Sequence, residues 1–203
     1  MFYLERGDFI GYCKLKQIER QLILYDIFSS NDEDTRISTI KYHLPGITIR
    51  TLQRDIRDLK DANVINVYFS RTRNAYINCD NKDIRFYSEG IQKRIMKKRR
   101  EFEEKSENKK ENSSRREKHL ERLNRLATLM NCGYVCENVI GLYFELFPNA
   151  TERMRKRDFE TLRNIGYCAG YDREMECFAL YQREGYGIYD GYRIRLRNGK
   201  MVH

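Results

Sequence analysis

Tryptophan is absent from the sequence, and only two prolines and three histidines occur among its 203 residues. So few prolines exclude a collagen-like or proline-rich chain. No apolar run approaches the roughly 18 residues that a membrane-spanning helix needs, and the N-terminal residues carry charge at once. We therefore expect no membrane contact, no cleaved secretory signal and a cytoplasmic location.

Motifs that mark catalytic and metal sites are also missing. The chain has no glycine-rich phosphate-binding loop, no G-x-S-x-G nucleophile motif and no H-E-x-x-H zinc motif. Its six cysteines form no C-x-x-C pair, and only Cys132 and Cys136 are close together. Zinc sites usually need several ligands at short spacings, so packed thiols in a reducing compartment are favoured over a zinc site or a redox pair. We expect a protein that is not an enzyme and that carries no cofactor or metal.

Positive charge is abundant but unevenly spread. The formal net charge is +9, and residues 91–118 alone contain twelve Lys or Arg and six Glu. Such a stretch cannot bury enough apolar surface to fold alone, although Ile91, Ile95 and Phe102 are spaced to share one helical face. We expect a connector that is helical at first and loose over 106–114. Its apolar stripe packs either on a second copy of the chain or on the chain's own neighbouring hairpin.

A sequence repeat flanks this connector. Residues 44–59 and 147–162 align at a constant offset of 103, and Pro, Thr, two Arg, Asp and Leu recur identically. A repeat of this kind predicts two similar structural units. We expect an N-terminal domain at 1–82, the charged connector at 83–117 and a second domain at 118–203.

The sequence pattern of each copy predicts three helices followed by a β-hairpin. In copy one, apolar periodicity predicts helices over 15–28, 37–43 and 49–61, and strands over 64–69 and 75–77. Pro45 and Gly46 end the second helix, and Thr48 is an N-cap for the third. Copy two repeats the order, with helices around 120–127, over 135–147 and from 151 to 166, and strands over 167–171 and 177–181. We expect an α+β fold, mostly α, with tandem winged helix-turn-helix domains joined by a charged helical linker.

Residues 48–59 and the Lys-Asp-Ala-Asn-Val-Ile segment that follows resemble the DeoR-type helix-turn-helix, which also opens the WYL-domain bacterial transcription regulators. The resemblance covers about residues 14–78 and, more weakly, about 120–181. It implies that the third helix of the unit enters the DNA major groove. The large C-terminal effector domain of that family would have no room here, so no sugar-phosphate or other small-molecule ligand is implied.

The third helix of each copy carries the candidate DNA-contacting residues. A basic stripe is often only a solvated face, but here it follows a helix-turn-helix turn in a basic protein, which favours nucleic acid. The candidates for base contact are Arg50, Thr51, Gln53 and Arg54, and those for phosphate contact are Arg57, Lys60, Arg71 and Arg73. The remaining candidates are the N-cap Thr48 and, in copy two, Thr151, Arg153, Lys156 and Arg157.

Copy two departs from the pattern on the inner side of its third helix. Arg155 stands at the core-facing place of Leu52, and Glu152 stands at the place of Ile49. Either the helix is rotated or Arg155 reaches the rim of the core. Copy two therefore either binds DNA or serves as a dimerisation or partner surface. Asp55 and Asp158 lie beside the core face in both copies, and we expect each to orient a neighbouring Arg or to bond a backbone N–H.

These features favour a sequence-specific double-stranded DNA-binding transcription regulator from a bacterium or a mobile element. Since one recognition helix reads only a few base pairs, we expect a homodimer. The alternative is a tandem winged-helix replication initiator, or an architectural or scaffold protein.

A further hairpin is expected around Asp190 and Gly191. The strand after it carries Arg193, Arg195 and Arg197 on one face, either as a charge-protected edge or as a DNA backbone contact.

Overall fold

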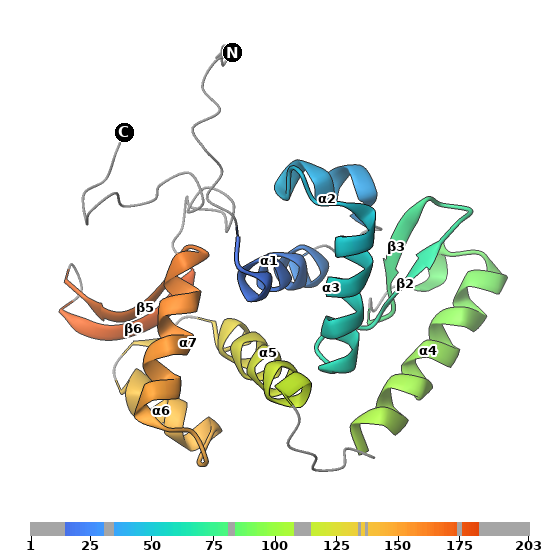
Figure 1. Cartoon of the computed structure of the whole chain (residues 1–203). Helices are drawn as coiled ribbons and strands as arrows, with labels where there is room; N and C mark the ends of the chain where they lie inside the picture. Colours follow the sequence, from blue (N-terminus) through green and yellow to red (C-terminus); the bar gives the residue numbers. More distant parts are fainter. Residues whose placement is uncertain are drawn as a thin grey trace, which may run out of the picture.

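The computed structural model describes residues 15–30, 35–80, 84–107, 115–133, 135–136, 138–173 and 176–182. Helices make up most of these residues, and short strands form two three-stranded antiparallel sheets. The protein is therefore an α+β protein that is mostly helical (Figure 1). Within these ranges, no helix combines the length and the apolar character needed to cross a bilayer.

Copy one contains three helices and three strands. Its elements are α1 (Gln17–Ser30), β1 (Thr35–Arg36), α2 (Ile37–His43), α3 (Ile49–Asp61), β2 (Val67–Ser70) and β3 (Ala75–Asn78). The strand order is β1-β3-β2, with Thr35 opposite Tyr76 and Phe69 also opposite Tyr76 from the other side. The three predicted helices and the predicted hairpin are confirmed. The two-residue strand β1 is a third strand that the sequence pattern does not indicate.

Copy two has the same order of elements. They are α5 (Arg115–Asn131), β4 (Val135–Cys136), α6 (Val139–Leu146), α7 (Glu152–Asn164), β5 (Tyr167–Asp172) and β6 (Cys177–Gln182), with strand order β4-β6-β5. The expectation of a helix over 135–147 is wrong at its start, because Val135 pairs with Leu180 in the sheet. Helix α6 begins only after Asn138, whose side chain caps it by accepting from the Gly141 N–H at 3.2 Å.

The connector begins as predicted with a charged helix, α4 (Glu89–Glu107), after a 3-10 turn, η1 (Ile84–Phe86). Ile95 is completely buried in a small cluster with Ile77 and Cys79, and Ile91 packs at its edge. Ile91 and Ile95 therefore pack on the hairpin of their own chain, which is the second of the two expected arrangements, while Phe102, the third residue of the stripe, is half-buried and lies outside this cluster. Most of the loose stretch expected over 106–114, and the whole of the hairpin expected around Asp190, lie outside the described residues.

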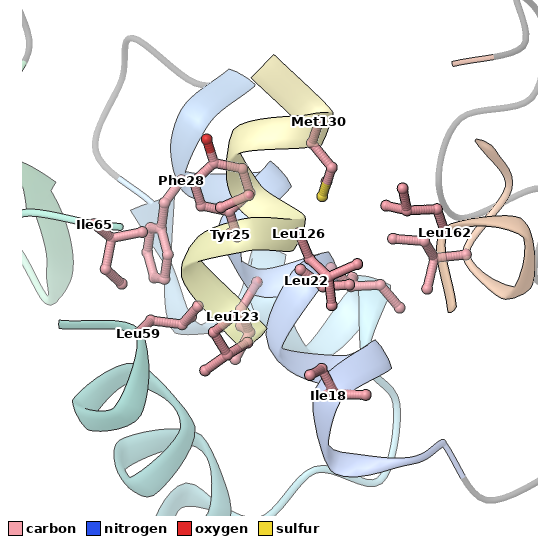
Figure 2. Close-up of a cluster of buried hydrophobic side chains, with 14 of the residues drawn as sticks. Ile18, Leu22, Tyr25, Phe28, Leu59, Ile65, Leu123, Leu126, Met130 and Leu162 are labelled. Atoms are coloured by element: carbon pink, nitrogen blue, oxygen red, sulfur yellow. The ribbon is translucent and has the colours of Figure 1, made fainter. Parts of the chain in front are cut away.

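The main hydrophobic core runs through both copies of the repeat. Ile18, Leu22 and Tyr25 from α1 belong to the same cluster as Leu123 and Leu126 from α5. Figure 2 shows these side chains meeting between the two helices, with Leu59 of α3 and Leu162 of α7 on either side. The first helices of the two copies thus pack against each other and share their buried surface.

Candidate nucleic-acid interface

Helix α3 begins where local signals place it. Gly46 takes a φ of 81°, a left-handed conformation that favours glycine, and the turn it forms with Pro45 separates α2 from α3. The hydroxyl of Thr48 then caps α3 by accepting from the Thr51 N–H at 3.1 Å. Leu52 and Leu59 are among the α3 side chains that enter the core. This start and this buried face fix which residues of α3 point outward.

The outward face of α3 brings the predicted base-contacting residues together. Arg50, Gln53, Arg54 and Arg57 are all exposed, and Thr51 and Lys60 are half-buried beside them. The acidic residues of the helix lie elsewhere: Asp55 is fully buried and Asp58 is 9% exposed. Only Asp61, at the last turn, combines a carboxylate with exposure. The exposed face is therefore basic because the carboxylates in the body of the helix are turned inward.

The predicted phosphate-contacting residues of the hairpin lie in the turn between β2 and β3. Arg71 and Arg73 are exposed there, and the hairpin follows α3 along the chain (Figure 1). The guanidinium of Arg73 lies 5.2 Å from the centre of the Tyr87 ring, at the start of the connector. This cation–π contact links the hairpin turn to the start of the connector.

Helix α7 presents the corresponding face in copy two. The Thr151 hydroxyl caps it by accepting from the Met154 N–H at 3.3 Å. Arg153, Lys156 and Arg157 are exposed, as are the acidic Glu152 and Glu160. The face is thus less basic than that of α3. Burial, then the charge of Arg122, lowers the pKa of Arg157, which nevertheless stays charged at neutral pH because arginine titrates so high.

The departure at Arg155 is accommodated without rotation of α7. Phe159 and Leu162 remain in the core, and Arg155 is only 9% exposed. Its Nε donates to Glu152 Oε2 at 2.9 Å, and its guanidinium lies 5.1 Å from the Phe159 ring centre. The hydrogen bond from Arg155 lowers the pKa of Glu152 and raises that of Arg155. The two substitutions relative to copy one therefore compensate each other at the rim of the core, while the exposed Glu152 also lies 3.9 Å from Lys156 and makes the outer face of α7 less basic.

Asp55 and Asp158 each bind arginine from the first helix of their own copy. Asp55 accepts hydrogen bonds from Arg20 of α1. Asp158 accepts one hydrogen bond from Arg122 and one from Arg125 of α5, both of 2.8 Å. The expectation that these carboxylates orient a neighbouring Arg is confirmed. The partners were not predicted from the sequence, although an Arg in the first helix of each copy is a signal that could have indicated them.

The Asp158 site includes a fourth side chain, Tyr143 of α6. Its hydroxyl donates to Asp158 at 3.0 Å. Burial, followed by the nearby Asp158 carboxylate, raises the pKa of Tyr143 to about 12. The hydroxyl consequently remains a hydrogen-bond donor at any physiological pH. Asp158 thus joins three helices of copy two, and it fixes the position of α7 from inside.

Replacing the cap residue Thr48 with alanine is expected to lower the free energy of unfolding by about 1 kcal/mol, because the Thr51 N–H loses its acceptor. Urea denaturation followed by circular dichroism measures the change. Thr72→Ala is the matched control, because Thr72 is exposed in the hairpin turn; it should change stability by less than about 0.5 kcal/mol. Equal effects of the two variants would contradict a capping role.

Comparison of the chain with family models, with curated proteins and with solved structures gives no match. Among the described residues, no group of three or more His, Cys, Asp and Glu side chains is arranged to hold a metal ion.

Proposed function

We propose that the protein is a sequence-specific double-stranded DNA-binding transcription regulator, and that each copy of its repeat is a winged helix-turn-helix. The observation that carries the proposal is the segregation of charge on α3. Its exposed positions include Arg50, Arg54 and Arg57, while Asp55 and Asp58 are turned into the molecule. Asp55 and Asp58 bond side chains of α1, which leaves the outer side of α3 with an excess of positive charge that suits phosphate.

The residues on this face suit base and phosphate contacts. Arginine offers a fork of donors that matches the major-groove edge of guanine, and glutamine matches that of adenine. Arg50, Gln53 and Arg54 lie in the first half of α3, the part of a recognition helix that contacts base edges. Phosphate contacts are assigned to Arg57, Lys60, Arg71 and Arg73. In copy two, Arg153, Lys156 and Arg157 take the corresponding role on α7.

Arg54→Ala is expected to weaken specific binding by about 1–3 kcal/mol and to relax preference at one base position. The duplex for this test is first obtained by selecting bound fragments from random double-stranded DNA, and affinity is then measured by fluorescence anisotropy. Lys118→Ala is the matched control, since it removes one exposed positive charge from α5 and none from the candidate residues of α3, α7 and the hairpin.

The selection itself tests the proposal. Recovery of a defined short site supports a transcription regulator, and recovery of phased arrays of sites favours the replication initiator instead. If no duplex is retained, the protein is not a DNA-binding regulator, and the scaffold alternative replaces it.

A further inference from the structure

The two copies of the repeat contact each other reciprocally. Helix α1 packs against α5, α5 packs against α3, and α1 packs against α7. Exchanging the copies turns α1 into α5 and α3 into α7, so the last two contacts are equivalent to each other. Reciprocal contacts of this kind are characteristic of a two-fold, isologous interface and do not arise in a head-to-tail one. In Figure 1, α3 and α7 accordingly flank α1 and α5 and run in opposite directions.

Polar contacts hold the C-terminal end of each candidate recognition helix to the opposite copy. At the end of α3, Asn124 of α5 donates to the Ala62 carbonyl at 3.2 Å, and Arg116 of α5 lies 2.6 Å from Asp61. At the end of α7, Asn164 donates to Glu19 of α1 at 2.9 Å. Each helix is therefore positioned by the first helix of both copies.

Hydrogen bonds and buried side chains also join α1 directly to α5 at the centre of the interface between the two copies. The Tyr25 hydroxyl donates to Asn131 at 2.6 Å, and Gln21 and His119 are joined by a hydrogen bond of 3.0 Å. Leu22 and Leu126 are completely buried in the shared core. The surface of α1 that a second chain would need in order to pair in this way is consequently covered by α5 of the same chain.

We infer that one chain binds a bipartite duplex site by itself, with α3 in one half-site and α7 in the other, in opposite orientations. This inference rests on the proposed DNA-binding function and names the form of its target. The internal pair of repeats replaces the homodimer that a single recognition helix would require. The packing of Ile91 and Ile95 of α4 on the chain's own hairpin agrees with this, because it covers two of the three apolar residues through which a dimer was expected.

Two properties of the target follow from the internal pair. The half-sites differ in sequence, because Thr51 and Gln53 of α3 are replaced by Met154 and Lys156 at the same places of α7. Their separation is fixed, because α3 and α7 are held on one core. The site is therefore two-fold in geometry without being a palindrome in sequence.

The experiment combines stoichiometry with footprinting on the duplex recovered by selection. Sedimentation should give one chain per duplex. Hydroxyl-radical footprinting at saturating protein should show two protected patches: Arg54→Ala loses one of them, and Arg157→Ala loses the other. Lys118→Ala is the control and keeps both. Inserting about five base pairs, half a helical turn, between the patches should abolish protection of one, because the helices cannot follow the rotation.

The outcomes separate this inference from the function on which it rests. A selected duplex that binds two chains, or two patches that both vanish in Arg54→Ala and both persist in Arg157→Ala, overturns the internal pair but leaves a DNA-binding homodimer. Recovery of no duplex overturns the proposed function and the inference with it. Circular dichroism of each variant confirms its fold, which both exposed substitutions should preserve.

Discussion

Asp158→Ala is expected to lower the free energy of unfolding by about 3–5 kcal/mol, because removing one partner of a buried ion pair leaves the other charge uncompensated. Asp158 is fully buried and accepts from Arg122, Arg125 and the Tyr143 hydroxyl. The substitution therefore removes the acceptor of the Arg125 guanidinium and of the Tyr143 hydroxyl, and it leaves Arg122 only its bonds to the Arg157 carbonyl and the Thr161 hydroxyl. Urea denaturation monitored by circular dichroism gives the change, and the shared core predicts a single cooperative transition.

Two further variants serve as controls for Asp158→Ala. Asp61→Ala breaks an exposed pair with Arg116, and should cost less than about 1 kcal/mol. Asp158→Asn keeps one acceptor oxygen and should fall between the two alanine variants, which allows a measurement if Asp158→Ala does not fold. A loss in Asp158→Ala no larger than that in Asp61→Ala would show that the two arginines reach water in the folded protein.

Duplex binding is expected to depend steeply on salt. If about six phosphates are neutralised, log affinity falls with log salt concentration with a slope near −5, because each contact releases condensed counterions. Between about 50 and 200 mM salt, this slope corresponds to a loss of roughly a thousandfold in affinity. Fluorescence anisotropy titrations of the selected duplex, at a fixed pH and a series of KCl concentrations, measure it.

The same titrations test the assignment of individual residues. Arg57→Ala should make the slope shallower by about 1, as expected for one lost phosphate contact. Lys118→Ala should leave the slope unchanged, because Lys118 lies on α5 and is not among the residues assigned to phosphate contact. A slope near zero for the unsubstituted protein would contradict the nucleic-acid proposal altogether.

The helix boundaries of copy one follow from signals that are local in the sequence. Helices α2 and α3 have the predicted bounds, because Pro45 and Gly46 prevent a continuous helix and Thr48 supplies a cap. The alternating pattern predicts that the first strand of the hairpin begins at residue 64, whereas β2 begins at Val67. Ile65 and Asn66 are buried like strand residues, yet they lie outside the ladder, so alternation alone cannot locate the first pair.

Features that depend on distant partners were beyond sequence reasoning. Strand β4 has two residues and exists because Val135 meets Leu180, and no periodicity can appear in so short a segment. The pairing of Arg155 with Glu152 is local, but its placement over Phe159 depends on how α7 packs. The contact between α1 and α5 joins residues about a hundred positions apart, as in the bond between Tyr25 and Asn131.

That contact between α1 and α5 has a genetic consequence. In a homodimer, one substitution at a two-fold interface appears twice and must suit both subunits. Here the two sides of the interface are encoded at separate positions of one chain. Tyr25 bonds Asn131 and Gln21 bonds His119, and neither pair has to be repeated with the two copies exchanged. Each half of the molecule is consequently free to diverge on its own, and under the bipartite binding inferred above a mutation in one half-site would be matched by a mutation in one repeat.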